Sequence, residues 1–304
     1  MKVVLLDPGA PLSCWPLTAT RRLYDCYVAN RPFGECVAEA WRGCGFPVEE
    51  ERGAPGAGTA LYVRGGAWLS REVLEGAAEA ELGTVWTTGG GEPLAWLGDG
   101  PKPPASASRR RVDPEAVLVR FPWDLLHVNE LLVGSLKENR IEGRVQENVH
   151  WDGFVVVGEG SVLLPGVFIE GNVVIGRNCK VGPNCYLRGN TSIGDNCHVG
   201  QAVEVKNSIL FPRVSVGHLS YCGDSIIGEK TNFGAGTIVA NLRHDGKIHR
   251  SLVQGELIDT GRRKFGTVVG DEVHTGIHTS IYPGRKLGPY TSTRPGQVVD
   301  RDLK

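Results

Sequence analysis

Side chains that bind anions, together with one histidine, recur between residues 186 and 250. They are Arg188, Lys206, His218, Tyr221, Asn232, Asn241 and Lys247. A neutral imidazole accepts a proton near neutral pH, and arginine and lysine form charge-assisted hydrogen bonds with phosphate. Taken alone, His218 is more simply interpreted as a structural histidine that the backbone satisfies. The interpretation therefore depends on the element that carries these residues.

That element is a repeat of six residues. Aliphatic side chains recur at this spacing at Val157, Leu163, Ile169, Ile175, Val181, Leu187, Ile193, Val199 and Val205. An α-helix has a period of 3.6 residues and a β-strand a period of two, so neither explains a spacing of six. Independent strands of a β-sandwich would be separated by turns of variable length. A strict period of six predicts a left-handed parallel β-helix, in which three hexapeptides form one triangular coil and the aliphatic residue points inward. Glycines such as Gly158 and Gly176 follow these residues, and we expect them there because glycine accepts backbone angles closed to other residues.

The repeat continues to Leu287 with shifts in phase. Its later members are Leu210, Val216, Cys222, Ile227, Phe233, Val239, Val269, Thr275, Ile281 and Leu287. A polar interruption runs from about Asn241 to Lys264 and carries Lys247 and several other basic residues. Insertions in a solenoid leave as surface loops, often on the binding face. We expect a loop that serves the function, although a solvated excursion would have the same composition.

The first part of the chain alternates like an α/β domain. Residues 1–6 and 60–63 are predicted strands, and residues 33–44 and 70–80 are predicted helices, the second with Ser70 as N-cap. This alternation predicts a sheet of parallel strands. The stretch 98–111, rich in Gly, Pro, Ser and Arg, is predicted to be loop. The predicted organisation is an α/β domain at 1–120, a connecting helix at 121–139 and the β-helix at 140–304.

Composition excludes several classes of function. The chain has 304 residues and a net charge of −1, so no basic surface indicates nucleic acid. There is no apolar run near 20 residues and no recognisable signal peptide, so we expect a cytoplasmic protein without membrane association. Cys179, Cys185 and Cys197 share one slot of the repeat and are predicted to be small buried hydrophobes. His274 and His278 are four residues apart in a β-helix, where that spacing predicts no metal site.

Two motifs carry a resemblance to a known family. Residues 217–224 read G-H-L-S-Y-C-G-D, and residues 232–241 read N-F-G-A-G-T-I-V-A-N. This region resembles the acetyltransferase half of the bifunctional N-acetylglucosamine-1-phosphate uridyltransferase/glucosamine-1-phosphate acetyltransferase family, and residues 264–277 resemble its archaeal-type members. The resemblance implies N-acetylation of an amino-sugar 1-phosphate by acetyl-CoA, with glucosamine-1-phosphate as the leading acceptor, as in UDP-N-acetylglucosamine biosynthesis. It also implies a homotrimer with sites in the clefts between prisms.

The resemblance assigns a role to each polar residue of the first set. The catalytic positions are matched by His218 as general base, Asn241 and Lys247. The positions that bind the sugar phosphate are matched by Arg188, Lys206, Tyr221 and Asn232. The positions that contact acetyl-CoA are matched by Ala235, Ile277 and Pro295. Leu242 stands where the family has an aromatic residue, and Ile277 stands where it has a serine.

The resemblance extends to residues 1–120, which look like a nucleotidylyltransferase domain that has lost its chemistry. The family's phosphate-loop glycine, catalytic arginine, lysine and magnesium-binding aspartate correspond to Pro11, Ser13, Leu23 and Gly66. Pro11 removes an N–H from a phosphate cradle, and Gly66 offers magnesium no oxygen. We therefore expect an inactive domain without Mg²⁺. Two alternatives stay open: a sugar-1-phosphate nucleotidylyltransferase that transfers a uridylyl or thymidylyl group, and a non-catalytic regulatory subunit that binds a sugar nucleotide.

Overall fold

The computed structural model describes residues 1–51, 58–105, 107–112 and 116–304. The chain forms two compact units. The first contains Met1–Pro11, Arg22–Cys26 and Pro32–Arg120, and the second contains Leu12–Arg21, Tyr27–Arg31 and Phe121–Lys304. Two short segments from the N-terminal part thus pack with the β-helix, which the sequence pattern did not indicate.

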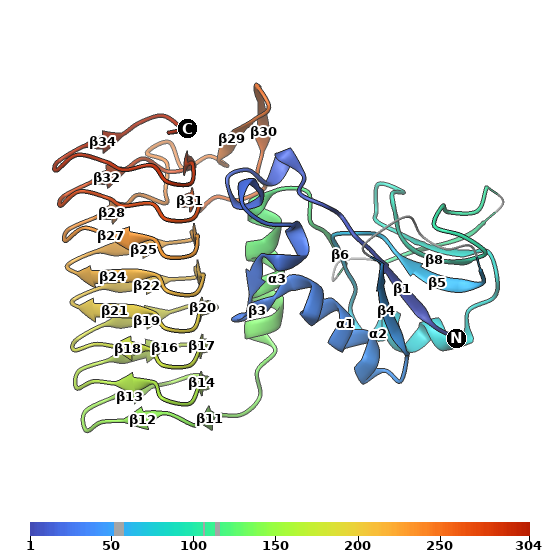
Figure 1. Cartoon of the computed structure of the whole chain (residues 1–304), viewed down its shortest axis with the longest axis horizontal. Helices are drawn as coiled ribbons and strands as arrows, with labels where there is room; N and C mark the ends of the chain where they lie inside the picture. The colour runs from blue at the N-terminus through green and yellow to red at the C-terminus, as the bar shows by residue number, and fades with distance from the viewer. Residues whose placement is uncertain (52–57, 106, 113–115) are drawn as a thin grey trace. The chain divides into compact units, whose positions relative to one another are not determined.

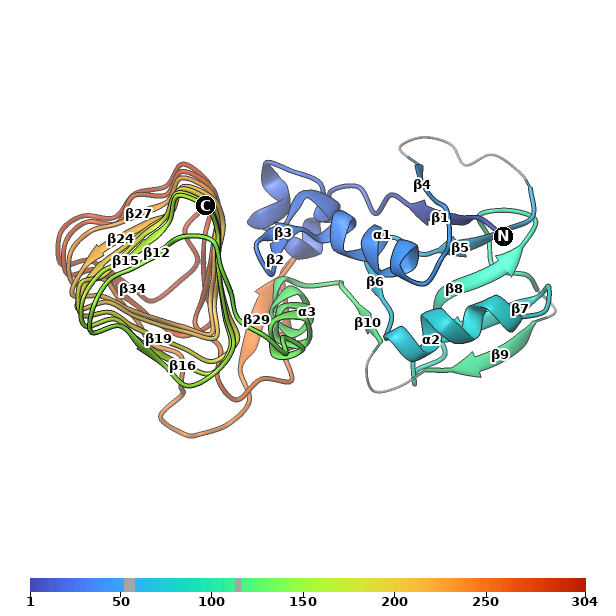
Figure 2. The same ribbon diagram turned by 90° about the horizontal axis from the view of Figure 1, so that it is seen from below.

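The second unit is a stack of coils with three parallel sheets, one on each side of a triangular prism (Figures 1 and 2). The first face contains β11 (Arg140–Ile141), β14 (Val155–Val157), β17 (Val173–Ile175), β20 (Thr191–Ile193), β23 (Ile209–Leu210), β26 (Ile226–Ile227), β31 (Thr267–Val269) and β33 (Arg285–Leu287). The second face contains β12 (Arg144–Val145), β15 (Val162–Leu163), β18 (Lys180–Val181), β21 (His198–Gln201), β24 (Ser215–His218) and β27 (Asn232–Phe233). The third face contains β13 (His150–Trp151), β16 (Phe168–Glu170), β19 (Tyr186–Arg188), β22 (Glu204–Lys206), β25 (Tyr221–Gly223), β28 (Ile238–Val239), β32 (Ser280–Ile281) and β34 (Val298–Val299). The predicted fold class, an α/β domain followed by a hexapeptide β-helix, is confirmed.

The aliphatic residues of the repeat fill the prism. All members from Val157 to Leu287 are buried, and Val299 extends the series by one coil. Cys179, Cys185 and Cys197 are buried free thiols in the same core, as predicted.

The reason we gave for the glycines of the repeat is wrong at most positions. Gly158, Gly194 and Gly200 do not have positive φ, and the corners with positive φ are often occupied by asparagines instead, such as Asn178 and Asn196. A Cβ at Gly158 would lie 2.7 Å from the backbone of the next coil, and one at Gly200 would lie 1.8 Å away. Glycine is therefore required by the close stacking of coils rather than by its backbone angles.

The predicted connecting helix is α3 (Pro122–Gly134), which ends five residues before the expected position. It packs along the first face beside β20, as Figure 1 shows in green. Its buried Asn129 accepts a hydrogen bond from Ser192 Oγ (2.7 Å) and donates one to the Asn190 carbonyl (2.7 Å). These bonds fix the helix against the prism.

The interruption after Asn241 contains a hairpin that we did not predict. Strands β29 (Arg250–Val253) and β30 (Glu256–Asp259) pair antiparallel. Gln254 and Gly255 between them have φ of 49° and 93°, as a two-residue hairpin turn requires. His249, at the base of the hairpin, is buried, with its Nε2 3.2 Å from the Asn241 carbonyl oxygen. The segment is therefore an ordered excursion from the coil.

The first unit contains a six-stranded sheet with the order β4-β1-β5-β8-β7-β9. Its strands are β1 (Val3–Leu6), β4 (Val48–Glu51), β5 (Ala60–Val63), β7 (Thr84–Thr87), β8 (Pro93–Gly98) and β9 (Ser108–Arg111), and β6 (Ala67–Trp68) pairs with β10 (Val117–Leu118). The helices are α1 (Phe33–Gly43) and α2 (Arg71–Gly76).

Three details of the first unit differ from the prediction. The sheet is mixed, because β8 runs antiparallel to both β5 and β7. Ser108–Arg111 is an edge strand and not loop; its four exposed residues include three arginines, which protect an edge from pairing with other chains. Ser70 is the N-cap residue of α2, as predicted, but its side chain makes no capping hydrogen bond. None of the helices in the described ranges is long and apolar enough to cross a membrane.

Candidate active site on the β-helix

The third face brings two of the predicted phosphate ligands together. Arg188 and Lys206 occupy equivalent outward positions on β19 and β22, which are paired in parallel. Tyr221 begins the next strand and lies beside Glu204. Stacked coils are about 4.8 Å apart, so these side chains are close neighbours on one surface.

A buried carboxylate lies behind them. Asp224, which is only 2% exposed, accepts hydrogen bonds from Lys206 Nζ at 2.9 and 3.2 Å and from Asn207 Nδ2 at 3.0 Å. Asn241 Nδ2 donates to it at 2.6 Å and also to Tyr221 Oη at 2.9 Å. Sequence reasoning quoted Asp224 in a motif but gave it no role; its place directly after the glycine that ends β25 was the available signal.

The same surroundings act on Tyr221. Burial, together with the charges of Asp224 and Glu204, raises the pKa of Tyr221 to about 12. The phenol therefore stays protonated across the physiological range and can donate a hydrogen bond.

Arg188 and Lys247 are the more accessible cations of this region. The Arg188 side chain is about one third exposed, with its Nε 3.6 Å from Glu204 and its guanidinium over the Tyr186 ring at 5.3 Å. Lys247 is exposed after Asp245, which pairs with Arg243. In the described part of the chain the Lys247 ammonium has no ion-pair partner. Both side chains can therefore turn toward an anionic ligand.

His218 lies at the corner between the second and third faces. The corner repeats through hydrogen bonds from Gly236 N–H to the His218 carbonyl (3.1 Å), from His278 N–H to the Ala235 carbonyl (2.8 Å) and from Gly296 N–H to the Ile277 carbonyl (2.8 Å). His218, Ala235, Ile277 and Pro295 thus stack one per coil and form an edge column roughly 14 Å long, three coil spacings. The His218 ring is exposed and, within the described residues, has no hydrogen-bond partner.

Asn232 lies apart from the other predicted ligands. It is exposed on β27 of the second face, between Ser215 and His274 of the adjacent coils. His198 shares this row, and its pKa is lowered by burial and by the charges of Lys180 and His218. Within one chain the structure therefore groups Arg188, Lys206, Tyr221 and Asn241 on the third face and leaves Asn232 on another.

The N-terminal segment that resembles the nucleotidylyltransferase phosphate loop is partly built into the second unit, which contains Leu12–Arg21. Arg21 forms ion pairs with Asp271 (2.5 Å) and Glu229 (3.1 Å), and Thr20 donates to Asp271 (2.5 Å). The Arg21 guanidinium also covers the Phe211 ring at 5.1 Å. These contacts anchor the segment to the β-helix, with Arg21 paired to two carboxylates.

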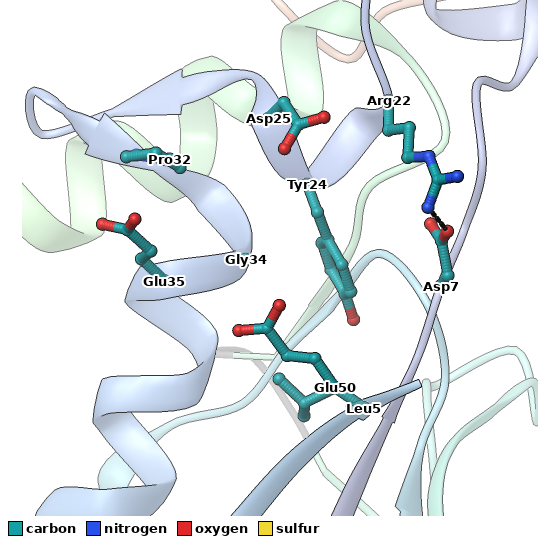
Figure 3. Close-up of a pocket in the computed structure, with 9 residues that line it drawn as sticks. All are labelled: Leu5, Asp7, Arg22, Tyr24, Asp25, Pro32, Gly34, Glu35 and Glu50. Atoms are coloured by element: carbon teal, nitrogen blue, oxygen red, sulfur yellow. Dashed lines mark hydrogen bonds and ion pairs between the residues drawn. The ribbon is translucent and has the colours of Figure 1, made fainter. Parts of the chain in front are cut away.

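The first unit contains a cavity of about 370 Å³ (Figure 3). Its charged lining residues are Asp7, Asp25, Glu35, Glu50 and Arg22, and the arginine is paired with Asp7. This excess of carboxylates opposes the binding of a triphosphate. At Gly66, where an aspartate would be needed, φ is +88° and a Cβ would lie 2.9 Å from the Val119 carbonyl oxygen. In the described residues no group of three or more potential metal ligands is present.

Comparisons with known proteins agree with the resemblance. Residues 169–289 match the family model of the GMPPB C-terminal domain. A "bifunctional sugar-1-phosphate nucleotidylyltransferase/acetyltransferase" of Sulfurisphaera tokodaii is 43% identical over 182 residues, which cover 60% of this chain and 45% of the relative. "Bifunctional protein GlmU" of Methanocaldococcus jannaschii is 39% identical over 183 residues, covering 60% and 44%. A solved UDP-N-acetylglucosamine acyltransferase of Francisella novicida is 14% identical with a TM-score of 0.30, covering 55% and 62%, a likeness too weak to bear on function.

These matches confirm homology to bifunctional nucleotidylyltransferase/acetyltransferases over about 60% of the chain. The chain spans about half the length of the curated relatives it matches. The motifs at 217–224 and 232–241 lie inside the segment that matches the family model. The acyltransferase-like β-helix is thus the part of the molecule for which a function can be argued.

Proposed function

We propose that the β-helix is an acetyl-CoA-dependent N-acetyltransferase that acts on an amino-sugar 1-phosphate, with glucosamine-1-phosphate as the leading acceptor. The observation that carries the proposal is that one prism has both the cationic side chains of the third face and the edge column that begins at His218. The printed names of the homologous relatives include acetyltransferase activity, which supports the choice of reaction. Arg188, Lys206 and Lys247 would hold the phosphate, and Asn232 and Asn241 would orient the sugar.

His218 is the proposed general base. Its unpartnered imidazole removes a proton from the acceptor amine, whose nitrogen attacks the thioester carbonyl carbon. A C–N bond forms, the C–S bond breaks, and the released coenzyme A sulfur takes up a proton. The column of Ala235, Ile277 and Pro295 continues from His218 along the edge and offers a long, narrow surface for the coenzyme arm. No covalent enzyme intermediate is needed because the thioester already provides a good leaving group.

We further propose a homotrimer in which the site is shared. Asn232 lies on a different face from Tyr221 and Asn241, so one prism cannot direct all of them at a single sugar. A cleft between two prisms would bring the second face of one copy against the third face of another. Lys247, on the exposed excursion, is then the residue we expect to act across the subunit boundary.

The test is coenzyme A release from acetyl-CoA and glucosamine-1-phosphate. His218→Ala should lower the rate roughly 10²- to 10⁴-fold, the usual contribution of a general base. His150→Ala is the matched control, an exposed histidine of the first coil, and should keep the wild-type rate. Equal rates for wild type and His218→Ala would remove the mechanism.

The same preparation separates the two other functions. Magnesium-dependent pyrophosphate release from UTP would support nucleotidylyl transfer, against which Gly66 and the acidic cavity argue. Failure of coenzyme A release with both glucosamine-1-phosphate and galactosamine-1-phosphate would contradict the acetyltransferase. Binding of a sugar nucleotide without either turnover would then favour a regulatory subunit.

A further inference from the structure

Asp224 is the most completely enclosed charged group on the third face. Its carboxylate receives N–H groups from three side chains, Lys206, Asn207 and Asn241. Its backbone is fixed as well, because its N–H donates to the Lys206 carbonyl (2.8 Å) and its own carbonyl accepts from Gly266 N–H (2.9 Å). A buried carboxylate with this many donors has a single arrangement, and its neighbours are fixed with it.

The first consequence concerns Asn241. A carboxylate can only accept hydrogen bonds, so the Asn241 side chain must direct its NH₂ group at Asp224. That NH₂ group also donates to Tyr221 Oη. Both N–H bonds of Asn241 are thereby used, and its amide oxygen is left as an acceptor. Since the Tyr221 oxygen already accepts, the proton of its hydroxyl is left as a donor.

We propose that Asp224 is a positioning residue that sets the hydrogen-bonding pattern of the sugar site. Asn241 presents an acceptor, Tyr221 presents a donor, and Lys206 is held by its ion pair with Asp224. The pattern fits a ligand that offers one donor and one acceptor close together, as sugar hydroxyl groups do. This inference rests on the proposed function and deepens it, because Asp224 acts on the acceptor substrate and not on acetyl-CoA.

The enclosure continues beyond the carboxylate. Asn207 donates its amide also to Glu130 Oε1 of α3 (2.7 Å), and Glu130 accepts from Arg262 at 2.5 and 3.3 Å. Arg262 lies near the end of the excursion that carries Lys247. One hydrogen-bond network therefore joins α3, the return of the excursion and the carboxylate that orders the site.

The test is Asp224→Asn. Asp224 has φ of +50°, a conformation that asparagine adopts readily, and Asn207 occupies the same corner one coil earlier with φ of +45°. The variant should therefore fold. The asparagine amide has one acceptor oxygen where the carboxylate has two, so it cannot accept from all three donor side chains. We therefore expect the KM for glucosamine-1-phosphate to rise roughly 10- to 100-fold, the range for a lost charge-assisted hydrogen bond. The KM for acetyl-CoA should stay unchanged.

Asp195→Asn is the matched control. Asp195 also accepts from an arginine and an asparagine, Arg177 and Asn30, but at another corner of the prism. Its KM for both substrates should equal that of wild type. A double-mutant cycle distinguishes this role from a general loss of structure. The rise in the KM for glucosamine-1-phosphate caused by Asp224→Asn should be much smaller in an Asn241→Ala background. Fully additive effects of the two substitutions on this KM would overturn the proposal.

Tyr221→Phe keeps the bond between Asp224 and Asn241 and removes only the proposed donor. It should also raise the KM for the sugar phosphate. If Asp224→Asn does not fold, this variant alone tests the proposed hydrogen-bonding pattern. An active wild type with unchanged KM in the variants that fold overturns this inference and leaves the proposed function intact. A wild type that neither releases coenzyme A nor binds glucosamine-1-phosphate in calorimetry overturns both.

Discussion

The two units of this chain differ in the balance of charged side chains at their candidate sites. On the β-helix, Arg188 and Lys206 share one face with the buried carboxylate of Asp224, and Lys247 is exposed on the excursion. In the first unit, four carboxylates and one arginine line the cavity shown in Figure 3. An anionic sugar phosphate is attracted to the first arrangement and repelled by the second. The comparison favours the β-helix over the α/β unit as the place for the proposed phosphate site.

The difference follows from how each unit positions its residues. In a β-helix, neighbouring coils are held in register by parallel pairing, so Glu170, Arg188 and Lys206 follow one another along a single face. The α/β unit has no such repeat, and its expected phosphate motif is divided between the two compact units. Thr20 and Arg21 pack with the β-helix, while Arg22 lies beside Asp7. The residues of this segment are therefore held by contacts within two different units.

The largest effect that would sharpen this comparison is expected from Arg21→Met. If Arg21 has become structural, its loss removes the cation from the buried Asp271, which keeps hydrogen bonds from Thr20 and from the Glu229 N–H. Breaking such a pair costs about 3–5 kcal/mol. Thermal unfolding of the β-helix should then shift down by roughly 10 °C. Binding of UTP should not change.

Arg213→Met is the control for Arg21. Arg213 pairs with the same Glu229 but is largely exposed, so its loss should cost about 1 kcal/mol or less. If Arg21→Met leaves the unfolding temperature unchanged and weakens UTP binding, Arg21 still belongs to a nucleotide site and the comparison fails.

A smaller effect is expected when one arginine is removed from each region. Arg188→Ala should raise the KM for glucosamine-1-phosphate roughly 10- to 100-fold, as expected for the loss of a charge-assisted hydrogen bond to phosphate. Arg22→Ala removes the cation of the acidic cavity and should leave that KM unchanged. Steady-state coenzyme A release measures both variants. A rise in KM for Arg22→Ala equal to that for Arg188→Ala would place the sugar phosphate in the wrong region.

The repeat made the β-helix predictable from the sequence because a period of six directly specifies inward positions. Val157 to Leu287 are buried as the spacing requires, whereas the residues of the edge column, His218, Ala235, Ile277 and Pro295, were singled out only through the resemblance. Asp224 was missed because its importance lies in three donor side chains that come from two other coils, Lys206 and Asn207 from one and Asn241 from another. The hairpin at Arg250–Asp259 was also missed, since its short strands follow no repeat.

The α/β unit was less predictable because its pairing is long-range. The antiparallel direction of β8 depends on its partners β5 and β7 and not on local pattern. The arginine-rich Ser108–Arg111 has the composition of a loop but is held as an edge strand by β7. The packing of Leu12–Arg21 with the β-helix depends on Glu229 and Asp271, more than 200 residues away, and no spacing rule connects them.

The smallest expected effect concerns Glu130 of α3, in the unit that contains the β-helix, and whether its charge stabilises that unit. Burial alone would raise the pKa of Glu130, but hydrogen bonds from His127, Arg262 and Asn207 and the charge of Arg262 lower it to about 2. Because this pKa lies below the ordinary value of 4.5, Glu130 stabilises the folded unit fully above pH 4.5, and the contribution is lost as the pH falls toward 2. Glu130→Gln should therefore lower the unfolding temperature by a few degrees at pH 7, with the difference from wild type shrinking progressively below pH 4.5. A difference that stays constant down to pH 3 would mean that Glu130 contributes through its shape and not through its charge, and the network behind Asp224 would then need no ion pair at α3.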